Sequence, residues 1–139
     1  MADPKKLSKV VKVRKAERDR LVLQVARLQL ELQNVEKFVV QLEKYAHDYS
    51  ANRNDVASKG ISSDSLQAMD SFGARLRATV DVQKSSSSAI NARLAQQKQL
   101  LSLAAEKLRG FEKVLEDAER LETQLTDRRQ ALDYLDQLK

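Results

Sequence analysis

The segment LVLQVARLQLELQNVEKFVVQLEKYAHDY, residues 21–49, decides the fold, because its apolar side chains recur at alternating steps of three and four residues. This spacing is a 3.5-residue repeat, which gathers the apolar side chains into a narrow seam along a helix that a second helix must cover. The same spacing begins nearer the N-terminus. The complete first seam is Leu7, Val11, Leu21, Val25, Leu28, Leu32, Val35, Val39, Leu42, Ala46 and Tyr49.

A second seam of the same period fills the other half of the chain. Its members are Met69, Leu76, Val80, Ile90, Leu94, Leu101, Ala104, Leu108, Phe111, Leu115 and Ala118 and, after a change of phase, Leu121, Leu125, Leu132 and Leu135. Polar residues interrupt it at Gln83, Ser87 and Gln97. The serine run 85–88 lowers helix propensity, but no Gly or Pro ends the helix there, so we expect the helix to continue.

Only one convincing turn separates the seams. Gly60 suits a left-handed helix stop, Asp3 precedes Pro4 as an N-cap would, and Asp64 or Ser63 is positioned to cap the second helix. The sequence therefore predicts an all-α fold in which two long helices form an antiparallel coiled-coil hairpin. We expect residues 1–139 to be a single domain, with helix 1 at about 4–57, a turn at about 58–63, and helix 2 at about 64–139 overhanging at its C-terminal end.

Composition excludes several classes of protein. The chain is 32% charged and has three Gly, one Pro and no Cys, which rules out disulfides and thiolate metal sites. The longest apolar runs, such as residues 38–40, are far shorter than the roughly 20 residues of a membrane span. No apolar stretch follows residues 1–6, so we expect no secretory signal there. There is no Gly-rich phosphate loop and no nucleophile with a base, and His47 is the only histidine. We expect no enzyme activity, catalytic residue, cofactor, metal or membrane insertion.

Charge is unevenly distributed along the chain, whose formal net charge is +5. Residues 1–20 contain eight bases and three acids, whereas residues 106–139 contain seven bases and nine acids. A basic amphipathic segment can bind nucleic acid or an anionic membrane surface, and the alternative is a solvated helix face. A forked basic helix that reads DNA needs Asn and Arg side chains set for base edges and a parallel dimer behind them, and the antiparallel hairpin expected here argues against that mode of binding.

Most of the aromatic side chains fall near the turn. Phe38 and Tyr45 flank the first seam, Phe72 flanks the second, and a turn near Gly60 brings Tyr49 opposite Phe72. Clustered aromatic side chains are enriched at interface hot spots, so a contact site is one interpretation. A hydrophobic clasp that pins the end of the hairpin is the other.

A family resemblance rests on residues 42–49 (LEKYAHDY), then Gly60-Ile61-Ser62, and then Phe72, Leu76, Val80 and Gln83. These stretches resemble the central signature of the FliJ family, the small coiled-coil proteins of the flagellar type III export apparatus. The resemblance is specific over residues 38–84, and the flanking arms match only as coiled coil. The equivalent stalk proteins of virulence type III secretion systems are the second choice, and a structural coiled-coil adaptor is a further alternative.

The resemblance implies a function without catalysis. FliJ-like proteins are similar in shape to the stalk subunit of rotary ATPases. They enter the hexameric flagellar export ATPase ring through the end that carries both termini, and they promote ring assembly and ATP hydrolysis. They also contact the cytoplasmic domain of the export-gate protein and some export chaperones. The implied localisation is cytoplasmic, peripheral to the inner membrane at the flagellar base, in a pathway that serves flagellum biogenesis, motility and chemotaxis. In isolation we expect a monomer.

Candidate site residues fall into two groups. The export-gate patch carried over by position from the family is Leu42, Tyr45, Tyr49, Phe72 and Leu76. For the ATPase ring we expect electrostatic guidance and packing from Lys9, Lys12, Arg14, Lys15, Arg18, Leu121, Leu125 and Leu132. Arg14 and Arg18 interrupt the apolar seam, and polar residues at such positions also fix the register of a coiled coil. Two other hypotheses stay open: a structural coiled-coil dimer, and a basic binder of nucleic acid or membrane surfaces.

Overall fold

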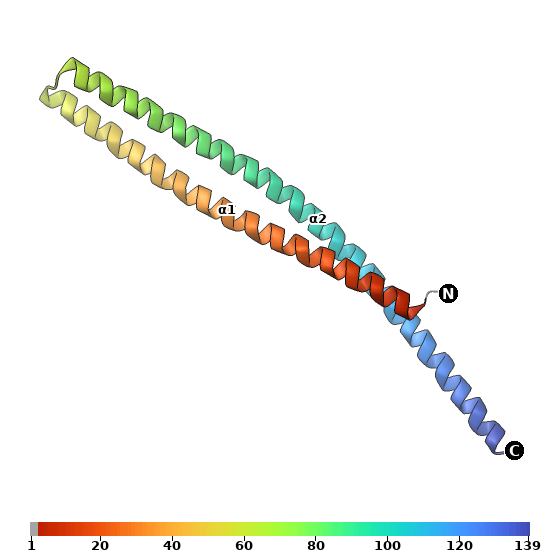
Figure 1. The fold of residues 1–139 in the computed structure, drawn as a ribbon. Helices are drawn as coiled ribbons and strands as arrows, with labels where there is room; N and C mark the ends of the chain where they lie inside the picture. The colour runs from red at the N-terminus through yellow and green to blue at the C-terminus, as the bar shows by residue number, and fades with distance from the viewer. Residues whose placement is uncertain (1–2) are drawn as a thin grey trace. The chain divides into compact units, whose positions relative to one another are not determined.

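Two helices account for nearly all of residues 3–139, the part of the chain that the computed structural model describes. Helix α1 spans Pro4–Lys59 and helix α2 spans Ser63–Gln137 (Figure 1). The all-α fold and the hairpin of two long helices are confirmed. α1 ends at Lys59, where the sequence predicted about residue 57, and α2 includes the serine run 85–88 without a break, as expected.

Local chemistry explains where the helices begin and end. Asp3 caps α1 as predicted, because its Oδ1 accepts a hydrogen bond from the Lys5 N–H at 3.1 Å. α1 stops at Gly60, whose φ of 84° lies in the left-handed region that only glycine adopts without strain. The predicted cap of α2 was wrong. Ser62 caps it, since its Oγ accepts a hydrogen bond from the Ser65 N–H at 3.2 Å and satisfies a donor of the first turn.

Contacts divide the chain into two compact units. The terminal unit comprises residues 3–24 and 97–139 of the described chain, and the turn unit comprises residues 25–96. In the turn unit α1 and α2 run antiparallel on either side of the turn at residues 60–62 (Figure 1). Its buried side chains are Val25, Leu28, Leu76, Val80, Ile90 and Leu94, all of them predicted seam members.

The terminal unit has a smaller core and an uncovered end. Leu21, Ala104 and Leu108 are buried there, and Leu108 is 2% exposed, the lowest value among the described core residues. Beyond Ala118 the pattern changes, because every residue of the C-terminal segment 119–139 is exposed. Figure 1 shows α2 continuing past the start of α1 in this unit. The leucines of that segment therefore have no covering helix within the described chain.

Candidate interaction surfaces

The aromatic cluster of the turn unit consists of Tyr45, Tyr49 and Phe72. Tyr49 lies between the other two, with ring centroids 6.4 Å from Tyr45 and 4.9 Å from Phe72 and with tilted rings. These separations are within the range of favourable aromatic pairs. Gly73 lies beside the cluster, and a Cβ added there would be in ordinary van der Waals contact with the Tyr49 ring at 3.9 Å. The predicted juxtaposition of Tyr49 with Phe72 is present.

The five residues expected to form the gate patch all lie in the turn unit, but they differ in exposure. Tyr45 is 52% exposed and Phe72 is 38% exposed, whereas Leu42 and Tyr49 are half-buried and Leu76 is buried in the seam. Tyr45 and Phe72 therefore supply most of the area that a partner could contact. Tyr49 contacts both rings, one on its own helix and one on the other, and leaves the rings of Tyr45 and Phe72 accessible.

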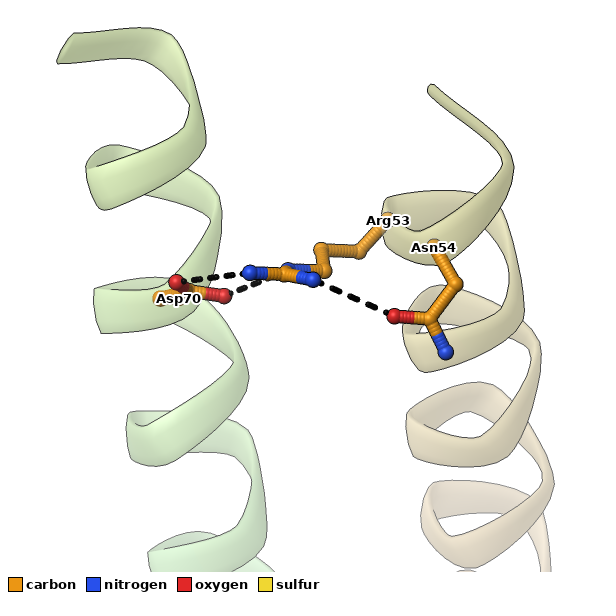
Figure 2. A network of polar contacts seen from close by, with 3 residues as sticks. All are labelled: Arg53, Asn54 and Asp70. Atoms are coloured by element: carbon orange, nitrogen blue, oxygen red, sulfur yellow. Dashed lines mark hydrogen bonds and ion pairs between the residues drawn. The ribbon is translucent and has the colours of Figure 1, made fainter. Parts of the chain in front are cut away.

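An ion pair crosses between the helices beside the cluster. Arg53 donates from Nε to Asp70 Oδ1 at 2.7 Å and from Nη2 to Oδ2 at 3.1 Å, and its Nη1 donates to Asn54 Oδ1 at 3.3 Å (Figure 2). This forked geometry suits a guanidinium and a carboxylate. The hydrogen bond from Arg53 lowers the pKa of the Asp70 carboxyl below its usual range. Sequence reasoning missed this pair, although the two residues lie at matching distances from the turn.

A second ion pair joins the helices farther along the turn unit. The Lys84 ammonium lies 2.6 Å from a carboxylate oxygen of Glu43, and this hydrogen bond raises the pKa of Lys84. Both ion pairs are open to solvent, where such contacts contribute little stability. Each pair forms only when the two helices are correctly aligned, so the pairs report the register of the turn unit.

The seam of the terminal unit contains the two predicted arginines. Arg14 is half-buried, with its guanidinium 5.5 Å from the centroid of the Phe111 ring and its Nη1 3.2 Å from Glu17 Oε2. Its Nε is buried with no hydrogen-bond partner among the described residues. Arg18 is also half-buried and pairs with its neighbour Asp19 at 2.8 Å. These arginines replace the aliphatic layers found in the turn unit, so this part of the seam is less apolar.

The remaining residues expected to contact the ring also lie in the terminal unit. A shallow groove has Lys15 and Arg18 on α1 and Glu112, Glu116 and Glu119 on α2. Lys9 and Lys12 are exposed. On the C-terminal segment Leu121 is 38%, Leu125 41% and Leu132 57% exposed. The structure thus places all eight residues in one unit, the leucines on the uncovered part of α2 and the bases on α1.

Residues 3–139 contain no cluster of His, Asp and Glu side chains that could hold a metal ion. Across the same residues, neither helix has a stretch that is both long and apolar enough to cross a bilayer.

Comparison with known families decides the affiliation. The family model described as flagellar FliJ protein matches residues 4–136, which is almost the whole chain. The chain belongs to the FliJ family. FliJ proteins are non-catalytic, cytoplasmic components of the flagellar export apparatus, and membership makes this chain a component of that apparatus. The match extends on both sides of residues 38–84, over the parts of the chain whose resemblance to the family rested only on their coiled-coil pattern. No curated protein and no solved structure matches the chain.

Proposed function

We propose that this FliJ-family chain is the central stalk of the hexameric flagellar export ATPase. In this role the terminal unit enters the ring, promotes ring assembly and stimulates ATP hydrolysis, while the chain itself hydrolyses no ATP. The observation that carries the proposal is the C-terminal segment, a continuation of α2 with an uncovered stripe of Leu121, Leu125 and Leu132. Leaving these leucines in water forgoes about 1.5–3 kcal/mol each, which a surrounding protein surface would recover.

Charge supports the same placement. The seam arginines and the lysines at positions 9, 12 and 15 give α1 of the terminal unit a positive surface. Charges around a buried apolar stripe speed association and fix orientation more than they add affinity. The lysines and arginines would therefore guide the terminal unit into the ring, and the leucines would hold it there.

The turn unit would bind a second partner, the export-gate protein. We assign the exposed rings of Tyr45 and Phe72, supported by Leu42, Tyr49 and Leu76, to the cytoplasmic domain of the export-gate protein. Binding there would place the chain peripheral to the inner membrane at the flagellar base. Export chaperones are further partners in this proposal. The isolated chain would be a monomer, because the seam of α1 is covered by the part of α2 that precedes residue 119.

The test measures ATP hydrolysis by the cognate ATPase at a fixed low concentration while this chain is titrated in. Leu121→Glu with Leu125→Glu should raise the concentration for half-maximal stimulation at least about a hundredfold, since two buried leucines are lost. Thr123→Glu with Gln130→Glu is the matched control, because it adds the same charge on the opposite face of the same segment. Tyr45→Ala with Phe72→Ala should leave stimulation unchanged and weaken binding to the gate domain.

Three results would count against the stalk assignment. The first is an absence of stimulation by a folded, monomeric sample. The second is equal loss in the leucine variant and its control, which would mean that added charge alone is responsible. The third is loss of stimulation in the double aromatic variant, which would move the ring contact to the turn unit.

A further inference from the structure

The first five turns of α1 present a basic face that points away from the seam. In the 3.5-residue repeat set by Leu7, Val11 and Leu21, the positions farthest from the seam are occupied by Lys5, Lys6, Lys9, Lys12, Val13, Ala16, Asp19, Arg20 and Leu23. All nine side chains are exposed. We call the five cations among them, at positions 5, 6, 9, 12 and 20, the outer basic face.

These cations have no ion-pair partner among residues 3–139. The one acid on that side of the helix, Asp19, is neutralised by Arg18 at 2.8 Å. Lys15, by contrast, lies on the side of the helix where the groove holds glutamates of α2. The outer basic face is thus a local excess of positive charge that the fold does not use.

Two cations of the outer basic face, Lys5 and Lys6, lie in the first turn of α1, directly after the Asp3 cap. The N-terminus of a helix is the positive end of the macrodipole, where acidic side chains stabilise and basic ones destabilise. α1 has no acidic residue in its first turn and has Lys5 and Lys6 there instead. The charges of Lys5 and Lys6 therefore add no stability to the start of α1.

Apolar side chains lie among the cations. Val13 is 65% exposed and Leu23 is 59% exposed, and neither contributes to the seam. Exposed aliphatic groups next to cationic side chains, as Val13 is to Lys9 and Lys12 and Leu23 is to Arg20, suit the boundary between lipid headgroups and acyl chains, where the apolar groups enter and the cations meet phosphates. The phosphates of a nucleic acid would interact with the cations but not with Val13 or Leu23. The outer basic face also has no aromatic, Asn or Gln side chain that could contact bases.

We propose that the outer basic face of α1 binds the surface of an anionic phospholipid bilayer directly, with the cations on headgroup phosphates and Val13 and Leu23 at the acyl boundary. Lys5, Lys6 and Arg20 have no part in the proposed ATPase contact. Lys9 and Lys12 belong to both proposed surfaces, so the variants that test the bilayer contact change only Lys5, Lys6 and Arg20, and vesicle binding is measured without the ATPase.

The experiment measures sedimentation of the full chain with vesicles of phosphatidylcholine alone or mixed with phosphatidylglycerol. Binding should require phosphatidylglycerol and weaken as salt is raised. Lys5→Glu, Lys6→Glu and Arg20→Glu together should lower partitioning by at least about a hundredfold, at roughly fivefold for each cation removed. Lys98→Glu, Lys107→Glu and Lys113→Glu, which make the same charge change on exposed positions of α2, should have a much smaller effect. Circular dichroism checks that both variants stay helical.

A second pair of variants separates lipid from nucleic acid. Val13→Ser with Leu23→Ser should weaken vesicle binding and leave any binding to a DNA duplex unchanged. Equal binding to pure phosphatidylcholine, equal loss in the two charge variants, or tighter binding to the duplex than to anionic vesicles at the same salt would each overturn the proposal. Loss of vesicle binding with ATPase stimulation intact in the Lys5, Lys6 and Arg20 variant would support it, and would leave the stalk proposal to its own test.

Discussion

The turn unit and the terminal unit use the same heptad seam in different ways. In the turn unit the buried layers are aliphatic, an aromatic cluster closes the seam, and two ion pairs, Arg53 with Asp70 and Glu43 with Lys84, join α1 to α2. In the terminal unit two arginines enter the seam, and each ion pair found among its described residues links near neighbours on one helix. Side-chain ion pairs thus join the two helices in the turn unit, whereas the terminal unit has none between its helices among the described residues and leaves Leu121, Leu125 and Leu132 uncovered.

The largest expected effect compares how much a leucine side chain contributes to stability in the covered and in the uncovered part of α2. Leu108→Ala should lower the free energy of unfolding by about 2–5 kcal/mol, because the side chain is 2% exposed and a cavity remains. Leu121→Ala, a similar truncation on the same helix, should change it by less than about 0.5 kcal/mol. Urea unfolding followed by circular dichroism measures both. Equal effects would mean that the C-terminal segment is covered in solution.

A smaller effect tests the aromatic cluster. Tyr49→Ala should cost about 2 kcal/mol, less than the roughly 3–5 kcal/mol of a fully buried ring, because Tyr49 is half-buried between Tyr45 and Phe72. Tyr45→Ala should cost much less, since that side chain is 52% exposed. Thermal unfolding of the two variants decides the point. If Tyr45→Ala were the more damaging, Tyr49 would not be the centre of the cluster.

The turn itself should respond to a single methyl group. Gly60→Ala should cost about 1 kcal/mol, because alanine is strained at a φ of 84°. No atom lies within 4 Å of the added Cβ, so the cost comes from the backbone and not from a clash. Gly110→Ala, at an exposed helical position that also has open space, is the control and should be neutral or stabilising. A destabilised Gly110→Ala variant would contradict this account.

The smallest expected effect concerns pH and the ion pair at Asp70. Because the folded pKa of Asp70 lies below its unfolded value, the pair contributes stability above the ordinary aspartate range. That contribution is lost as the pH falls through the lowered pKa. Carboxyl-detected NMR titration should find the Asp70 pKa depressed in the folded chain, and Arg53→Ala should raise it.

The buried positions could be predicted from the sequence, because burial in a coiled coil follows a fixed period of 3.5 residues. Leu28, Leu94 and Leu108 are buried as the period requires, and Arg14 and Arg18 are half-buried where they interrupt it. The cap at Ser62 was missed because Ser62, Ser63 and Asp64 each carry an oxygen able to accept the bond, and only the path of the chain selects one.

The exposed contacts were harder to predict. Arg53 and Asp70 pair through long, rotatable side chains, so their meeting depends on the register that the turn sets and not on either residue type. The outer basic face was only partly foreseen. The excess of basic residues in 1–20 was evident from the sequence. The heptad pattern predicts only which side chains face the other helix, so it says nothing about the exposure of Val13 and Leu23 on the opposite side.

The continuity of α2 across residue 118 has a consequence for the lifetimes of its hydrogen bonds. The helical hydrogen bonds of α2 continue unbroken past residue 118, but only the residues before 119 pack against α1. A lone helix of about 20 residues is marginal in water, since tertiary contacts supply most helical stability. Amide hydrogens of residues 119–137 should therefore exchange with deuterium far sooner than those around Leu108, and a bound partner should erase that difference.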